Sequence, residues 1–214
     1  MYLGLREAIV RGQLYPGHRM LVLDIANALN VSQAPVREAL ERLKQEGLLV
    51  GKANKGSIVA EIRQDEIEEI YALRELIEWD AVRKSLPKLQ AEDFERLQLI
   101  YEGMVDAAKK DDLFRFIDQD MDFHGYFFEK SGNRTIHHLW QQIAVKLKRF
   151  QAITNKLYYS DLSSIAVGHA PLIEVLKTGN EAEIERAFIR HMKEVWRLMG
   201  RNGLGEQEEK GRSQ

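Results

Sequence analysis

The segment "DMDFHGYFFEK", residues 120–130, places an aspartate and a histidine four residues apart among aromatic side chains. At about 100° per residue, Asp120 and His124 both fall inside the apolar face of a helix. That face consists of Leu113, Phe116, Ile117, Phe123 and Phe127. A carboxylate on a buried face is costly unless it is paired, hydrogen-bonded or bound to a metal. The stretch alone therefore leaves two readings open, a hydrogen-bonded core pair or part of a metal site.

Two later segments repeat this pattern with single histidines. His169 interrupts an apolar face in residues 162–177, and His191 interrupts one in residues 181–199. Aspartate and neutral histidine are ligands for divalent zinc, nickel, manganese or iron, and zinc is our first choice. Three apolar faces that carry metal-capable residues favour a divalent metal site, although a lone histidine on an apolar face is more often a hydrogen-bonded core residue.

Two arginines in other predicted helices are candidates for binding an organic acid. Some divalent metals prefer six ligands. If the protein supplies four, about two coordination positions remain, and a carboxylate effector could occupy them. Arg74 shares a helix face with Glu78, and Arg149 lies in "KLKRF". The alternatives are a structural ion pair for Arg74 and a solvated side chain for Arg149. His137 and His138 lie off the apolar face of their segment and are interpreted as surface residues.

The composition limits the class of protein. The 214 residues suit one large domain or two smaller ones, and 44% hydrophobic with 30% charged residues is typical of a soluble globular protein. The absence of cysteine excludes disulfides and thiolate metal sites. No apolar run is long enough for a membrane span, and the N-terminus lacks the pattern of a secretory signal. We expect a cytoplasmic protein without a membrane partner.

The elements that would position these residues fall into two parts. Residues 1–60 carry eight Lys and Arg against five Asp and Glu, a net charge of +3, whereas the remainder carries −5. Periodicity predicts helices at 65–86, 91–109, 111–130, 134–159, 162–177 and 181–199. The predicted fold class is mainly α: a domain over 1–62, an all-helical antiparallel bundle over 63–200, and a disordered polar tail over 201–214. The basic first part suits contact with an anion.

Within residues 1–62 the order of elements predicts a winged helix-turn-helix. A helix at 3–12 precedes "DIANALN", for which Asp24 is a candidate N-cap, and a tight turn leads to a helix capped by Ser32 and ending at Gly47. Two β-prone runs around "GKANKG" then form a hairpin. In this fold the third helix enters the major groove of DNA.

The start of the third predicted helix carries groups that can contact DNA. Ser32, Gln33 and Arg37 can bind phosphates or base edges, and Lys55 with Gly56 would form the tip of the hairpin, where glycine allows close approach of the backbone. The alternative for Arg37 is an i,i+4 ion pair with Glu41 on a solvated face.

Both parts resemble known families. "DIANALNVSQAPVREALERLKQEGLLV" followed by "KGSIV" resembles the DNA-binding half of GntR-type bacterial transcription regulators. "DMDFHGYFFEKSGN", "GHAPLIEVLKTGN" and "AFIRHMKEV" resemble the all-helical effector domain of the FCD subfamily. The resemblance implies that the first turn of the third helix and the wing tip bind DNA. It also implies a metal site whose ligands are Asp120, His124, His169 and His191.

The implied function is a homodimeric repressor or activator that binds a pseudo-palindromic double-stranded operator and responds to a small carboxylate effector. Two alternatives remain at this point: a metal-dependent enzyme with a DNA-binding tether, and a constitutive DNA-binding protein with structural buried histidines. No HExxH or GxSxG pattern is present, and we expect that the chain is not an enzyme.

Overall fold

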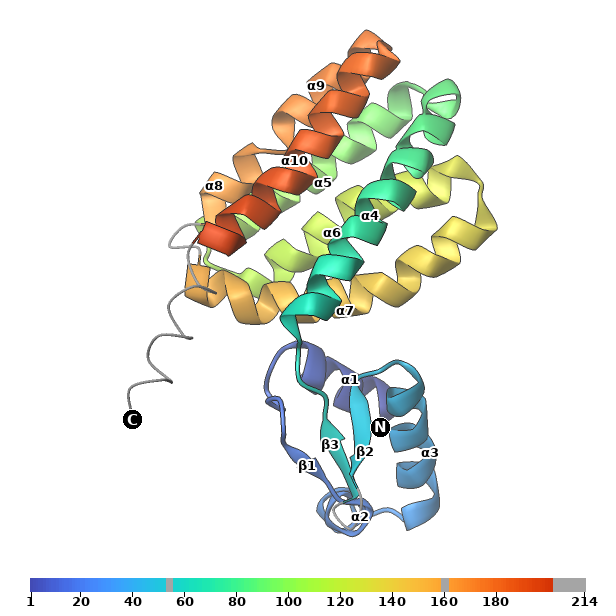
Figure 1. Cartoon of the computed structure of the whole chain (residues 1–214), viewed down its shortest axis with the longest axis vertical. Coiled ribbons are helices and arrows are strands. Elements are labelled where there is room, and N and C mark those ends of the chain that lie inside the picture. The colour runs from blue at the N-terminus through green and yellow to red at the C-terminus, as the bar shows by residue number, and fades with distance from the viewer. Residues whose placement is uncertain (53–55, 159–161, 202–214) are drawn as a thin grey trace. The chain divides into compact units, whose positions relative to one another are not determined.

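The computed structural model describes residues 1–52, 56–158 and 162–201. The chain divides into two compact units, one from Met1 to Ile67 and one that begins at Glu68 (Figure 1). The first combines helices with a small sheet, and the described part of the second is helical. The predicted class, mainly α with an N-terminal winged helix-turn-helix, is confirmed.

The first unit contains three helices and a three-stranded antiparallel sheet. Its elements are α1 Tyr2–Val10, β1 Arg19–Met20, α2 Val22–Leu29, α3 Gln33–Gln45, β2 Leu49–Lys52 and β3 Gly56–Val59. The strand order is β1-β3-β2, with Val50 opposite Ile58 in the predicted hairpin. Strand β1 was not predicted, because two residues are too few for a periodic pattern.

Local signals at the helix ends explain the turn between α2 and α3. Asn30 adopts the left-handed conformation at the end of α2, with φ of 52°, and Gly47 does so after α3, with φ of 72°. The expected cap at Asp24 is wrong, because α2 begins at Val22 with Leu21 in the N-cap position. Asp24 lies instead in the first turn, where the helix dipole favours a carboxylate.

An apolar core joins the three helices of the first unit to its sheet. Helix α3 packs against α1, α2 and β2. The buried residues are Ile9, Val10, Met20, Ala26, Val36, Ala39, Leu40, Leu43, Leu48, Leu49 and Val59. Burial of this inner side of α3 leaves the side with Ser32 and Arg37 exposed.

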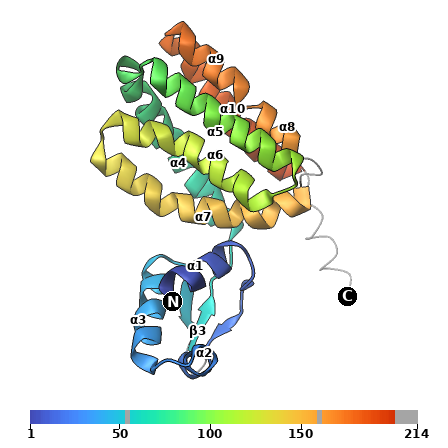
Figure 2. The same cartoon turned by 180° about the vertical axis from the view of Figure 1, so that it is seen from behind.

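The second unit is a bundle of mostly long helices. These are α4 Gln64–Ser85, α5 Ala91–Lys109, α6 Leu113–Ser131, α7 Arg134–Tyr158, α8 Leu162–Val167, α9 Ala170–Thr178 and α10 Glu181–Arg201, with a short 3₁₀ turn η1 at Leu86–Lys88. Helices α5, α6 and α7 follow one another in alternating directions (Figure 2). Helix α5 also contacts α8 and α9, and α10 contacts α9 and α7.

The predicted helix over 162–177 is in fact two helices. Helix α8 ends at Val167, and α9 begins at Ala170 with His169 as its N-cap residue. Pro171 lies in the first turn of α9, where its missing N–H costs nothing, whereas inside a continuous helix its ring would clash with the preceding turn. The break therefore places His169 at a helix start rather than on a helix face.

Parts of two sequence predictions lie outside the described residues: the wing-tip Lys55, and residues 202–214 of the tail predicted as disordered. Arg201 is the last residue of α10. Among the helices that the structure describes, none is both long and apolar enough to cross a membrane.

Candidate metal centre and DNA-reading helix

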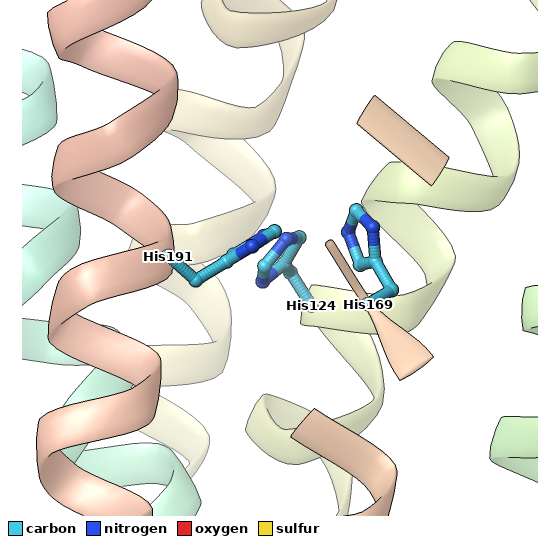
Figure 3. Close-up of side chains that lie close together, drawn as sticks. All are labelled: His124, His169 and His191. Carbon is cyan, nitrogen blue, oxygen red and sulfur yellow. The ribbon is translucent and has the colours of Figure 1, made fainter. Parts of the chain in front are cut away.

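Three histidines from three helical segments converge inside the second unit. His124 comes from α6, His169 from the start of α9 and His191 from α10. One ring nitrogen of each lies within 4.8 Å of the others, and the rings lie side by side in Figure 3. His124 and His169 are 1% and 0% exposed. The sequence pattern had placed all three on inner faces, and the fold brings them to one point.

Asp120 adjoins two of these histidines. Its Oδ1 atom lies 3.1 Å from His169 Nε2 and 3.8 Å from His124 Nε2. Its Oδ2 atom accepts a hydrogen bond of 3.0 Å from Gln151 Nε2 on α7. Asp120 is not part of the mutual cluster of histidine atoms, but one of its oxygens faces the same space. The four predicted metal ligands are therefore neighbours.

In His124 and His169 the Nε2 atom faces Asp120 and the Nδ1 atom faces away from it. The partners of the Nδ1 atoms indicate where the ring protons lie. His169 Nδ1 lies 3.3 Å from the Ile165 carbonyl oxygen, and His124 Nδ1 contacts Glu78 Oε1. Both partners only accept, so each Nδ1 carries a proton, and in a neutral ring the Nε2 atom is then left with a lone pair. His169 Nε2 is buried and has no hydrogen-bond partner among the described residues. Neutral rings would direct both Nε2 lone pairs at Asp120 Oδ1, an arrangement that repels unless a cation lies between them.

The ionisation states suit metal binding. Burial lowers the pKa of His124 and lowers that of His191 well below its usual value, which favours the neutral imidazole in both. Burial would raise the pKa of Asp120, and the positive charge of the nearby Arg74 guanidinium lowers it. A neutral imidazole and an ionised carboxylate are the forms that bind metal.

Glu78 is a functional candidate that the sequence did not predict. The sequence indicated only that it shares a helix face with Arg74. Its Oε2 accepts a bond of 2.8 Å from Arg74 Nε, and its Oε1 contacts His124 Nδ1. Burial opposes ionisation, yet His124 and Arg74 lower the pKa of Glu78 to about 2. A carboxylate behind a ligand histidine fixes the ring and raises its basicity. The i,i+4 spacing to Arg74 predicted the ion pair, but not this second contact.

The remaining candidates are placed as follows. Arg74 is 3% exposed and forms the structural ion pair with Glu78, which was the alternative to effector binding. Arg149 is 4% exposed, so the alternative of a solvated side chain is wrong. His138 is exposed and His137 partly exposed, and each contacts a glutamine one turn further along α7. The interpretation of these two histidines as surface residues is confirmed.

The donor set fits a divalent ion. Three imidazole nitrogens and one carboxylate oxygen are ligands that zinc accepts in a tetrahedral site and that nickel, manganese or iron accept in larger sites. The second contacts of His124 and His169 supply the outer support that such ligands need. The residues present could therefore hold a metal ion.

The predicted DNA-binding residues of the first unit are exposed at the start of α3. Ser32 is the N-cap residue and its side chain makes no capping hydrogen bond. Arg37 donates a hydrogen bond of 2.9 Å to Gln33 Oε1, while Glu41 pairs with Lys44. The alternative pairing of Arg37 with Glu41 is thus replaced by a contact between two predicted DNA-reading side chains.

The backbone at the base of the wing requires glycine. Gly56 has φ of 73°, and a Cβ atom there would lie 3.0 Å from Leu21 Cδ2. An L-residue would therefore be strained and crowded at the first position of β3. The glycine next to the predicted wing tip is explained by this conformation.

Comparison with known families agrees with both halves of this description. The FCD domain model matches residues 69–194, and the model for bacterial regulatory proteins of the gntR family matches residues 1–59. This chain belongs to the GntR family and carries an FCD domain. GntR/FCD proteins are DNA-binding transcription regulators, so the chain is a regulator and not an enzyme.

Similar proteins support this assignment. The chain is 28% identical to the gluconate operon transcriptional repressor of Bacillus subtilis strain 168 over 196 residues, which cover 89% of this chain and 80% of the relative. It is 25% identical to LutR of the same strain over 207 residues, covering 87% and 94%. The solved structure of E. coli McbR/YncC shares the fold with a TM-score of 0.78 at 21% identity, covering 94% and 95%.

Proposed function

We propose that operator binding by this GntR-family regulator is controlled by a small carboxylate effector, which binds at a divalent metal ion held by Asp120, His124, His169 and His191. The observation that carries the proposal is the convergence of the Nε2 atoms of His124 and His169 on one oxygen of Asp120, at 3.8 and 3.1 Å. A bound ion would satisfy all three groups, and zinc is the first choice among the ions that this donor set accepts.

The ion would supply positive charge and coordination positions for an acid. Arg74 is the first candidate to bind the acid together with the metal. Its pair with Glu78 uses the Nε–H, and a guanidinium has four further N–H groups in a fixed plane. Arg149, also buried, is the second candidate. These two residues would select a carboxylate over a neutral ligand.

The effector would act on DNA binding through the arrangement of two winged domains. We propose a homodimer on a pseudo-palindromic operator, since helix-turn-helix dimers read two half-sites related by their own symmetry. Ser32, Gln33 and Arg37 of α3, with Lys55 and Gly56 of the wing, would make the DNA contacts. The acid changes operator affinity only if it binds one arrangement of the dimer more tightly than the other.

Metal analysis tests the first half of this proposal. Protein purified without a nickel column is expected to contain about one divalent ion per chain by mass spectrometry of the metals. His169→Ala removes one ligand and should lose the ion, while His138→Ala, at an exposed position, should retain it. Metal-free wild-type protein, together with unchanged stability of His169→Ala, would instead support a constitutive DNA-binding protein with structural histidines.

A further inference from the structure

Gln151 is a buried amide at the edge of the metal centre. It lies on α7 and is 6% exposed, and its Nε2 donates the 3.0 Å hydrogen bond to Asp120 Oδ2. The other oxygen of Asp120 is the one that faces His169 and His124. Only one carboxylate therefore separates the Gln151 amide from the two histidines.

The chemistry of Asp120 determines the orientation of this amide. An ionised carboxylate only accepts hydrogen bonds, so the group that faces Asp120 Oδ2 must be the NH₂ group of Gln151. The opposite orientation would place two acceptors in contact. The Oε1 atom of Gln151 therefore points away from Asp120. The hydrogen bond to Asp120 fixes which end of the amide is oxygen and which is nitrogen.

The Oε1 atom of Gln151 is buried and lacks a donor. None of the described residues gives it a hydrogen bond. A buried carbonyl oxygen without a partner is unfavourable and is uncommon in folded proteins. Because the same amide is held in place by Asp120, it cannot rotate toward another donor without losing that bond. A donor from outside the chain would satisfy it.

We propose that Gln151 Oε1 accepts a hydrogen bond from a hydroxyl group of the effector, so that the effector is a small hydroxy acid. The inference rests on the proposed function, in which the carboxylate of the same molecule binds at the metal. Gln151 then has two tasks: it holds Asp120 through Nε2, and it recognises the hydroxyl through Oε1.

Charge distinguishes a hydroxy acid from an amino acid, whose ammonium group could also donate to Oε1. The pair of Arg74 with Glu78 has no net charge, and Asp120 contributes one negative charge. A divalent ion and the buried Arg149 guanidinium would leave an excess of positive charge at the site. An ionised hydroxy acid would reduce this excess, whereas a zwitterionic amino acid would leave it buried and uncompensated, which is costly.

Calorimetric titration of zinc-loaded, full-length protein with matched acids tests this inference. Lactate and propionate differ by one hydroxyl, as do malate and succinate, and alanine carries an ammonium group at the position of the hydroxyl of lactate. The wild type should bind at least one of the hydroxy acids about tenfold or more tightly than its deoxy partner, since a site that hydrogen-bonds a hydroxyl rejects the analogue that lacks it. Alanine should bind more weakly than lactate.

The variant Gln151→Met keeps the length of the side chain and removes the acceptor. Its preference between the paired acids should fall to within about threefold, because the hydroxyl no longer has a partner. Gln142→Met, at an exposed glutamine on the same helix, should keep the wild-type preference. Zinc content and circular dichroism of both variants establish that they are folded and loaded.

The outcomes separate the inference from the proposed function. Equal affinity of the wild type for both members of each pair overturns the hydroxyl contact and leaves the metal-dependent carboxylate site intact. If Gln151→Met loses affinity equally for both acids and keeps the preference between them, Gln151 only positions Asp120. This result also overturns the hydroxyl contact. Tighter binding of alanine than of lactate would contradict a hydroxy acid as the effector and indicate an amino acid instead. If none of the five acids binds, the proposed function itself is contradicted.

Discussion

In the candidate metal centre, His124 and His169 have partners for their Nδ1 atoms, whereas the Nε2 atom of His169 lacks one in the described part of the chain. Glu78 accepts from Arg74 and contacts His124, and the Ile165 carbonyl holds His169. The inner nitrogen of His169 has no such partner among the described residues. A set of purely structural core histidines would be expected to satisfy both ring nitrogens. This asymmetry supports the proposed metal site.

A substitution of Glu78 tests the support of His124. Glu78→Gln retains an amide oxygen for Arg74 but removes the charge behind the imidazole. Zinc affinity should fall about 10- to 100-fold, as is usual when such an outer partner is lost. Competition with a chromophoric chelator measures the change.

Glu75→Gln is the matched control for this prediction. Glu75 lies on the same helix and pairs with Lys193 at a partly exposed position, so zinc affinity should stay near that of the wild type. Equal zinc affinities of Glu78→Gln and Glu75→Gln would show that Glu78 has no part in the metal centre.

Helical periodicity located Asp120, His124 and His191 correctly because each lies on the inner face of a long helix. The same reasoning could not find the contact between Glu78 and His124, which joins residues 46 positions apart. It also missed Gln151, since a single glutamine in "KRFQAI" carries no pattern that distinguishes a buried amide from an exposed one. Contacts of this kind depend on how helices pack, and one sequence does not contain that information.

At the scale of the elements, Asp93 ties the start of α5 to α6. It accepts from Tyr126 and Lys130 on α6 and from the backbone N–H of Gln90. Burial opposes its ionisation, but these hydrogen bonds outweigh burial and hold the pKa of Asp93 below its usual value. The folded state therefore favours the ionised form more than the unfolded chain does, and this stabilises α5 against α6.

Removal of the Asp93 carboxylate should lower the free energy of unfolding by an amount that depends on pH. Asp93→Asn is expected to lower the free energy of unfolding by about 1–2 kcal/mol at pH 7. Because the pKa of Asp93 is lower in the folded state, its ionisation stabilises the folded protein at pH values above the unfolded-state pKa of about 3.9. This stabilisation is lost as the pH falls through the folded-state pKa. The difference between wild type and variant in urea unfolding should therefore shrink below about pH 4.

The control for this prediction is Asp106→Asn. Asp106 is paired with Lys110 and Arg115 at the surface of α5, where solvent screens ion pairs. It should not show a comparable loss of stability. A difference for Asp93→Asn that is constant from pH 7 to pH 3 would contradict the role of its charge.

Helix α3 gives the prediction for DNA binding. Arg37 is exposed and contacts only Gln33 among the hydrogen bonds described for it, so Arg37→Ala should leave the circular dichroism spectrum and the melting temperature unchanged. It should abolish retention of the specific DNA site in a gel shift, because arginine at the start of a recognition helix contacts base edges.

Lys44→Ala removes an equal charge from the far end of α3, where Lys44 pairs with Glu41, and should retain most of the DNA affinity. The site itself can be selected from random DNA by the wild-type protein. Wild-type affinity in Arg37→Ala would exclude this residue from the interface.

The number of long helices and the hairpin were predictable because caps, glycines and apolar periodicity agree along most of the chain. The division of residues 162–177 was not, since apolar spacing continues through the break between α8 and α9. Pro171 was the available signal, because proline favours the first turn of a helix over its interior. The break matters for the site, as it puts the backbone of His169 at the beginning of a helix.

In the whole molecule, a DNA-binding unit and a helical bundle with the candidate metal centre lie on one continuous chain. Coupling between an effector site and a distant DNA site is a free energy, usually 1–3 kcal/mol, which corresponds to a change of about 5- to 150-fold in operator affinity. The metal is required for this coupling if the acid binds through it. The coupling should accordingly disappear when either the metal or one of its ligands is removed.

The most direct test is the operator dissociation constant of the full-length, zinc-loaded protein, measured by fluorescence anisotropy with and without a saturating acid. An acid whose binding has been established by calorimetry should change this constant by about fivefold or more. The change should be absent in metal-free protein and in His169→Ala. An operator dissociation constant that is the same with and without the bound acid would contradict control of DNA binding from the metal centre.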